Sequence, residues 1–137
     1  MALTHVVDTS VMTRLHLPAV RRRVADLAAD NKLGRTFMTD LEIGFSARNG
    51  REWEQLNLES ELLPCLEIAD VHFRRALEVQ HRLARAGNCG RKIPDLLIAA
   101  AAESVGATVL HYDTDFELIA GVTGQQVEWV VKPGSVD

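Results

Sequence analysis

The chain has few of the residues that stabilise small proteins lacking a large core. Its 137 residues include two cysteines, Cys65 and Cys89, which form no CxxC pair and have no histidine at zinc-finger spacing. We therefore expect neither disulfides nor structural zinc, and interpret both cysteines as reduced thiols of a cytoplasmic protein. Apolar residues make up 47% of the sequence. That content predicts one domain over residues 1–137 with a continuous core.

Long apolar runs and a basic charge balance are also absent. No run is long enough to span a bilayer, and the first residues lack the basic and apolar regions of a secretory signal, so we expect no membrane association. Lys and Arg number 15 against 19 Asp and Glu, which argues mildly against a nucleic-acid partner. The argument loses force if a cation neutralises several of the acids, because the remaining surface can then be basic.

Short apolar runs alternate with amphipathic segments along the chain. Strands separated by helices predict an α/β fold, a three-layer α/β/α sandwich with a mainly parallel central sheet. Residues 31–34 are interpreted as a turn. Asp70 is interpreted as the cap of a long helix whose inner side carries Phe73, Leu77, Leu83 and Ala84. The predicted strands are 3–7, 35–38, 65–69, 108–112 and 127–131, and the main predicted helices are 18–29, 39–47, 51–63, 70–85, 94–105 and 114–120.

Four acidic residues lie where apolar segments give way to polar ones. Asp8 and Asp113 each follow a predicted strand, Asp95 opens an apolar helix, and Glu42 lies in the first turn of another. Because ligands bind at the carboxyl ends of strands in an α/β sheet, we expect these carboxylates to converge there. Converging carboxylates repel one another without a cation, and hard oxygen ligands favour Mg²⁺ or Mn²⁺.

Each acid also has a purely structural interpretation. Glu42 lies three residues after Thr39, the spacing of a capping box, and Thr114 with Glu117 has the same spacing. The aspartates could likewise cap helices, since negative charge is favourable at a helix N-terminus. For any one acid the capping role is the commoner. All four acids, however, fall on one edge of the predicted sheet. Their common position favours a metal site over four separate helix caps.

Four segments carry the acidic residues in order along the chain: VVDTS at 6–10, TDLEIG at 39–44, KIPDLLIA at 92–99 and LHYDTDFELIA at 110–120. These segments resemble the motif blocks of PIN-domain ribonucleases, specifically bacterial VapC-type toxins. The blocks follow the order of the family and cover essentially the whole chain. The resemblance implies a PIN-like, Rossmann-like fold, a homodimer, and Mg²⁺- or Mn²⁺-dependent cleavage of RNA. It also implies a substrate among the structured RNAs of the translation machinery (tRNA or rRNA) and inhibition by a cognate VapB-type antitoxin.

The resemblance also assigns residues. Asp115 matches an additional acid of many members, and Ser10 matches a hydroxyl near the first acid. We expect Glu42 to position or deprotonate the water that attacks the phosphodiester. The catalytic and metal-binding acids implied by the family are Asp8, Glu42, Asp95 and Asp113.

Basic and apolar residues supply further candidates. Lys92 and Arg91, just before the helix of Asp95, are accessory candidates for phosphate contacts, as are Arg48 and Arg51, although a solvated rim is the commoner role for each. The aromatic residues are few, and we interpret most of them as core. Candidates for a dimer surface are Leu56, Leu58 and Leu62.

Three other functions stay open at this stage. His5 and His111 precede Asp8 and Asp113, so a metal-free two-histidine ribonuclease is conceivable, although strand histidines are more often packed. Asp113-x-Asp115 faintly resembles the aspartate pair of metal-dependent phosphatases. A non-catalytic interaction module could use the acids to bind a basic partner. The RNA, its cleavage position, the antitoxin and the number of metal ions are left open by the sequence.

Overall fold

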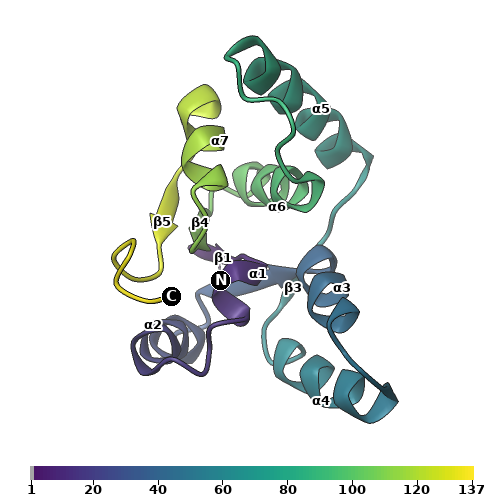
Figure 1. Cartoon of the computed structure of the whole chain (residues 1–137), viewed down its shortest axis with the longest axis vertical. Helices are drawn as coiled ribbons and strands as arrows, with labels where there is room; N and C mark the ends of the chain where they lie inside the picture. The colour runs from purple at the N-terminus through teal and green to yellow at the C-terminus, as the bar shows by residue number, and fades with distance from the viewer. Residues whose placement is uncertain (1) are drawn as a thin grey trace.

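Five parallel strands form the centre of the computed structural model, which describes residues 2–137 (Figure 1). The strand order is β3-β2-β1-β4-β5, and every neighbouring pair is parallel. The sheet therefore grows outward from β1 in both directions, and its topological switch point lies between β1 and β4. The strands are β1 (His5–Val7), β2 (Leu33–Thr36), β3 (Cys65–Leu66), β4 (Thr108–His111) and β5 (Val127–Trp129).

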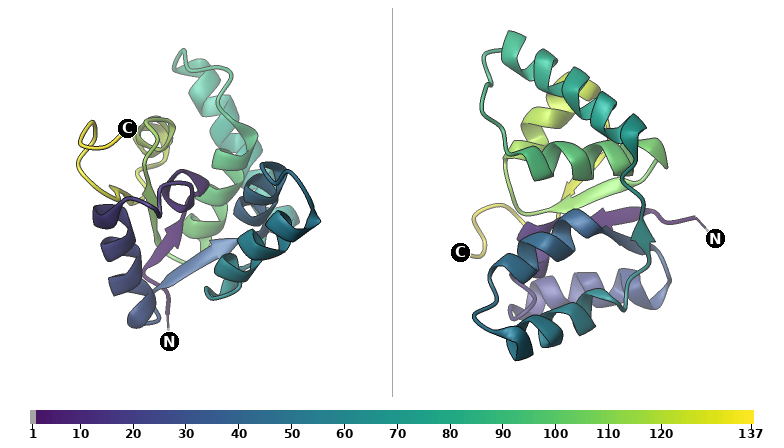
Figure 2. Two further views of the ribbon diagram at one scale, coloured as in Figure 1. Left: turned by 60° about the horizontal axis from the view of Figure 1, so that its bottom comes forward. Right: turned by 90° about the vertical axis from the view of Figure 1, so that its right-hand side faces the viewer.

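Helices cover both faces of the sheet (Figures 1 and 2). Val6 of β1 packs with α5, α6 and α7, whereas Val7 packs with α2, as the alternation of side chains along a strand requires. The predicted three-layer α/β fold with a parallel sheet is confirmed. The helices are α1 (Thr9–Met12), α2 (Pro18–Ala29), α3 (Phe37–Phe45), α4 (Gly50–Ser60), α5 (Asp70–Arg85), α6 (Ile93–Ser104) and α7 (Asp115–Thr123).

Helix α6 is the central helix, as its sequence predicts. Every residue from Asp95 to Ala102 is buried, because the helix packs against α5, α7 and the sheet. A fully buried side chain such as Leu97 or Ile98 contributes about 1.5 to 3 kcal/mol. This burial also places the carboxylate of Asp95, in the first turn, away from solvent.

The second strand begins two residues earlier than predicted. Leu33 and Gly34 belong to β2 and not to a turn, while Phe37 and Met38 already belong to α3. A Cβ atom on Gly34 would lie 2.4 Å from Leu3 Cδ1 and 2.6 Å from Leu66 Cδ1. Glycine therefore allows Leu3 and Leu66 to pack closely over this strand, a role that sequence alone does not distinguish from a turn.

The predicted inner face of α5 is correct at Leu83 and wrong at Phe73, Leu77 and Ala84. Phe73 and Leu77 are 50% and 65% exposed, and the inner face consists of Ala76, Val79 and Leu83. The helix has apolar residues on two faces, and the smaller ones allow the close approach to α6. Asp70 is also not the cap: the N-cap is Ala69, whose N–H donates to Nδ1 of His72 at 2.9 Å.

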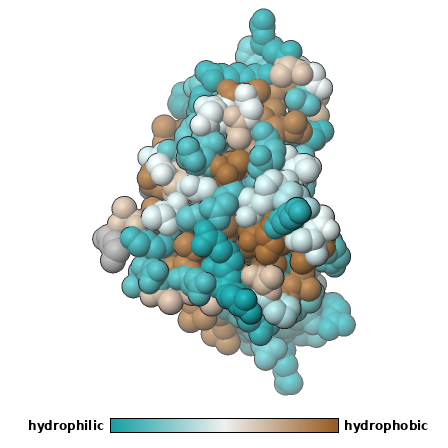
Figure 3. Space-filling view, turned by 90° about the vertical axis from the view of Figure 1, so that its left-hand side faces the viewer, coloured by the Kyte–Doolittle hydropathy of each residue, from teal (hydrophilic) through white to brown (hydrophobic). Residues whose placement is uncertain are grey.

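Most phenylalanines lie outside the core, contrary to the prediction. Phe37 and Phe45 of α3 and Phe73 of α5 are exposed, and Phe116 alone of the four is buried. Among the dimer candidates, Leu58 and Leu62 are exposed and Leu56 is half-buried. Figure 3 shows a different face, next to β5 and the C-terminus, on which hydrophilic residues predominate. None of the helices formed by residues 2–137 has the length and apolar character of a membrane span.

The close packing at Gly34 predicts a stability defect. Gly34→Ala should lower the free energy of unfolding by about 1 to 3 kcal/mol, because Leu3 and Leu66 must move to admit the methyl group. The matched control is Gly121→Ala in α7, where a Cβ meets nothing within 4 Å and the helix should gain about 0.5 to 1 kcal/mol. Urea denaturation of both variants tests this; equal stability would contradict it.

Candidate metal centre

Asp8 lies at the carboxyl end of β1, at the switch point of the sheet. Its backbone N–H donates to the carbonyl of Leu110 at 2.9 Å, which fixes the end of β1 against β4. Oδ2 accepts the N–H of Ser10 at 2.9 Å and its hydroxyl at 2.6 Å. Oδ1 is buried and has no hydrogen-bond partner among residues 2–137. Burial raises the pKa of Asp8, the hydrogen bonds from Ser10 oppose this rise, and the charge of Glu42 adds to it.

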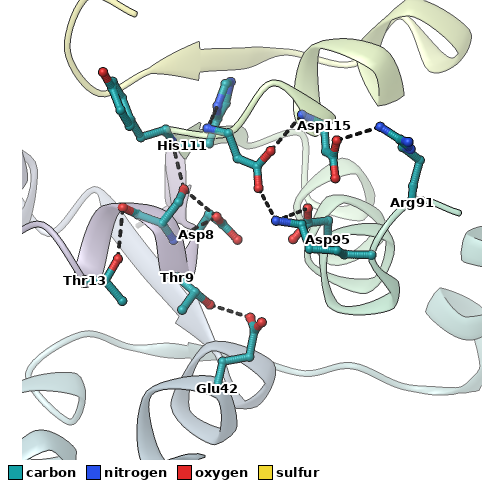
Figure 4. A network of polar contacts seen from close by, with 12 residues as sticks. Asp8, Thr9, Thr13, Glu42, Arg91, Asp95, His111 and Asp115 are labelled. Carbon is teal, nitrogen blue, oxygen red and sulfur yellow. Dashed lines mark hydrogen bonds and ion pairs between the residues drawn. The ribbon is translucent and has the colours of Figure 1, made fainter. Parts of the chain in front are cut away.

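Glu42 reaches towards Asp8 from α3 (Figure 4). Its Oε1 accepts the hydroxyl of Thr9 at 2.6 Å, and the hydroxyl oxygens of Thr9 and Thr39 lie 3.2 Å apart. Thr9 follows Asp8 directly in the chain. This threonine therefore ties the carboxylate of Glu42 to the end of β1.

Asp95 is a buried acid whose pKa is strongly raised. Only 4% of the residue is exposed, and its Oδ2 has no hydrogen-bond partner in the described part of the chain. Burial raises the pKa of Asp95 to about 8, and the charge of Asp8 contributes to the rise. Without a cation, Asp95 is therefore largely protonated at neutral pH.

Asp113 and Asp115 follow β4 and bind the two basic residues that precede α6. Oδ2 of Asp113 accepts from Lys92 Nζ at 2.5 Å, and Oδ1 of Asp115 accepts from Arg91 at 2.9 Å. Burial alone would raise the pKa of Asp113, but the hydrogen bonds from Lys92 and from the N–H of Asp115 bring this pKa below its usual value.

The structure brings the predicted acids together at the carboxyl edge of the sheet, in two subsets. Ligand oxygens of Asp95, Asp113 and Asp115 all lie within 4.8 Å of one another. Asp8 and Glu42 lie outside this group of three, but Asp8 is near enough to Asp95 for its charge to raise that pKa. Figure 4 shows Asp8, Asp95 and Asp115 facing the same gap.

These residues fit a divalent cation. Two buried carboxylate oxygens, Asp8 Oδ1 and Asp95 Oδ2, lack hydrogen bonds from residues 2–137, and unpartnered buried polar atoms are rare in folded proteins. All five predicted ligands are carboxylates, the donor type that Mg²⁺ and Mn²⁺ prefer. The site is an acidic cluster suited to a hard cation.

The proposed capping boxes are wrong. Helix α3 begins at Phe37, so Thr39 is not its cap, and Glu42 binds Thr9 instead. Thr114 is the N-cap of α7 but makes no side-chain cap bond, and Glu117 binds His111. Asp8 and Asp113 do accept backbone N–H groups at helix starts, and the metal-site interpretation must therefore rest on their other oxygens.

Both histidines are packed and hydrogen-bonded. His111 is fully buried: Nε2 lies 2.9 Å from Glu117, and Nδ1 accepts the N–H of Asp113. Burial lowers the pKa of His111, although the hydrogen bond to Glu117 opposes this effect. His5 lies 3.1 Å from Glu128, at the opposite end of β1 from Asp8. This arrangement does not favour a two-histidine mechanism.

Basic candidates lie in two different environments. Arg91 and Lys92 bind the acids directly, whereas Arg48 forms an exposed ion pair with Glu52, as a residue of a solvated rim does. Thr9 was missed as a site residue. Its position inside the Asp-Thr-Ser motif was visible in the sequence, but its partner is 33 residues away, and no local pattern indicates it.

The chain is thus an α/β protein whose parallel sheet carries a cluster of acids at its switch point. Such a cluster is suited to binding a cation. The chain belongs to the PIN-domain family, whose model matches residues 5–122. The predicted resemblance is therefore confirmed.

Comparison with known proteins supports this family assignment. It is 53% identical to Ribonuclease VapC51 of Mycobacterium tuberculosis, with 100% of both chains covered. It is 44% identical to Ribonuclease VapC21 of the same species, with 98% of this chain and 99% of that protein covered. The fold is similar to VapBC2 from Rickettsia felis bound to a DNA fragment from their promoter, with a TM-score of 0.77, 17% identity, and coverage of 94% of this chain and 99% of that chain.

The raised pKa of Asp95 predicts that an asparagine stabilises the metal-free protein. The folded pKa is about 8 against 3.8 for the ordinary side chain, so folding retains a proton and stability falls as pH rises from about 4 to 8. Asp95→Asn removes this dependence and should add roughly 2 to 5 kcal/mol at pH 8, with little gain near pH 4.

Urea denaturation in chelator at pH 4, 6 and 8 measures the effect. Asp26→Asn, on an exposed position of α2, is the matched control and should leave the pH dependence of stability unchanged. A gain that is the same at every pH, or a loss at pH 8, would contradict the prediction.

Proposed function

We propose that the chain is a Mg²⁺- or Mn²⁺-dependent endoribonuclease, the toxin of a toxin–antitoxin pair. Membership of the PIN-domain family and two relatives named as ribonucleases support the reaction class. The observation that carries the metal dependence is the pair of buried oxygens of Asp8 and Asp95 that accept no hydrogen bond from residues 2–137, with Asp113 close to Asp95. We assign cation binding to Asp8, Asp95 and Asp113, with Asp115 as an additional ligand.

The protein residues have separable tasks in cleavage. A bound divalent cation supplies Lewis-acid stabilisation of charge on phosphate oxygens and makes water more acidic. Ser10 fixes the carboxylate of Asp8, because its hydroxyl donates to Oδ2 and accepts the N–H of Tyr112 at 2.8 Å. Glu42, oriented by Thr9, positions the attacking water or takes its proton.

The substrate and partner follow from the family. We propose structured RNA of the translation machinery, tRNA or rRNA, as substrate, and a VapB-type antitoxin as inhibitor. Similarity to VapBC2 supports the partner through the fold. We propose the whole chain as a single PIN-like domain that forms a homodimer, for which exposed Leu58 and Leu62 supply apolar surface.

Two alternatives remain distinguishable. Release of phosphate from a small phosphomonoester would favour a metal-dependent phosphatase built on Asp113 and Asp115. Binding of a basic partner without cleavage of any RNA would favour an interaction module. The named ribonuclease relatives weigh against both.

Loss of the first acid should abolish cleavage. Asp8→Asn removes one charge that binds the cation and changes the shape of the side chain little. We expect the rate of RNA cleavage to fall by roughly 10³-fold or more, because a bound cation stabilises the transition state by several kcal/mol. The measurement is cleavage of purified total RNA in Mg²⁺ or Mn²⁺, with Asp26→Asn as the charge-matched control.

Chelator provides the second arm of this test. Wild-type cleavage should stop in chelator and return with added Mn²⁺. Undiminished cleavage by Asp8→Asn, or activity that survives chelation, would refute the metal mechanism and return attention to His111.

Thr9 should act as a positioning residue. Thr9→Val keeps the shape but removes the 2.6 Å hydrogen bond to Glu42, and loss of such an orienting partner typically costs 10- to 100-fold. We expect this loss in kcat, with KM for RNA nearly unchanged. Thr108→Val is the control, because Thr108 lies at the first residue of β4, at the end of the strand away from the acidic cluster. A change confined to KM would mean that Thr9 contacts RNA instead.

The RNA target requires an experiment in cells. Brief induction of the wild-type chain should yield new RNA ends at one or a few positions in tRNA or rRNA, and the Asp95→Asn variant should yield none. Sequencing of RNA ends measures this. New ends confined to messenger RNA would reject the proposed substrate while leaving the nuclease assignment intact.

A further inference from the structure

Lys92 places its ammonium group inside the acidic cluster. Nζ lies 2.5 Å from Asp113 Oδ2 and 3.8 Å from Asp95 Oδ2. The latter oxygen is buried and accepts no hydrogen bond from residues 2–137. The ammonium therefore contacts two of the three carboxylates that could bind a cation together. A lysine expected to contact RNA phosphate points instead at the proposed metal ligands.

The surrounding charges explain this position. Three aspartates meet within 4.8 Å, and the chain supplies two cations to them from adjacent positions, Arg91 to Asp115 and Lys92 to Asp113. Without such counter-ions the carboxylates would repel one another strongly in a partly buried site. In the protein without a bound metal ion, Arg91 and Lys92 thus balance the negative charge of the aspartates.

We propose that Lys92 is a tethered counter-ion of the acidic cluster formed by Asp95, Asp113 and Asp115, and that a divalent cation displaces Lys92 when it binds to Asp95 and Asp113. This inference rests on the proposed metal-dependent function. An ammonium and a divalent ion that share a carboxylate oxygen repel each other at separations near 4 Å, so each weakens the binding of the other. Binding of the divalent ion therefore favours departure of the ammonium.

The location of Lys92 suits such an exchange. It is the N-cap residue of α6 and has extended backbone, so its long side chain can rotate outward without unwinding the helix. The side chain is already 58% exposed. Once displaced, the ammonium would lie beside the acidic cluster at the protein surface, where it can contact an RNA phosphate.

Calorimetric titration of Mn²⁺ tests the exchange without RNA. Lys92→Gln should bind Mn²⁺ about tenfold more tightly than wild type, because the ion no longer competes with a charge-assisted hydrogen bond to Asp113. Lys132→Gln, an exposed lysine outside the acidic cluster, is the control and should leave the affinity unchanged. Circular dichroism confirms that each variant is folded.

A second measurement uses the unmodified chain. Lysine acetylation by a water-soluble reagent, quantified by mass spectrometry, should proceed several-fold faster at Lys92 with saturating Mg²⁺ than in chelator. The ammonium released from Asp113 is then open to the reagent. Acetylation of Lys132 should not change.

The outcomes separate this proposal from the proposed function. If wild type binds Mn²⁺ and Lys92→Gln binds it equally or more weakly, or if Mg²⁺ leaves Lys92 acetylation unchanged, Lys92 is not a displaced counter-ion, and the metal-dependent function stands. If neither protein binds Mn²⁺, the metal-dependent function fails, and this proposal fails with it.

Discussion

Repulsion between carboxylates is the constraint around which this molecule is arranged. Asp8 and Asp95 are buried, and each has an oxygen that accepts no hydrogen bond from residues 2–137. A core normally excludes such groups, since a buried carboxyl oxygen without a hydrogen-bond partner costs free energy in either protonation state. Their presence at the ligand-binding edge of a sheet supports the proposed cation site, where local stability is reduced.

The topology of the sheet makes this concentration of charge possible. Pairing of β1 with β4 aligns Val7 with Leu110, so the residues that follow both strands emerge side by side. Ser10 then bridges the two strand ends through Asp8 and the N–H of Tyr112. Helix α6 brings Asp95 from a distant part of the sequence, and its buried apolar length holds that carboxylate in place against repulsion.

Sequence patterns predicted those features that depend on local order. The ends of apolar strands located Asp8 and Asp113, and the apolar run of α6 predicted a central helix. Features decided by distant partners were missed. Gly34 belongs to a strand because Leu66 packs beside it, and Thr9 orients Glu42 across 33 residues. The predicted inner face of α5 was partly wrong because two apolar stripes compete on one helix, and only packing against α6 selects between them.

The acids of the cluster differ in what controls their charge, and this difference affects how tightly the site can bind a divalent cation. Burial and the charge of Asp8 raise the pKa of Asp95 to about 8, whereas Lys92 and a backbone N–H lower the pKa of Asp113. A cation that binds both must release a proton from one and an ammonium from the other, and each release subtracts from its net affinity. In the proposed mechanism, RNA phosphate offsets both costs, because it supplies further oxygen ligands to the cation and a new partner to Lys92.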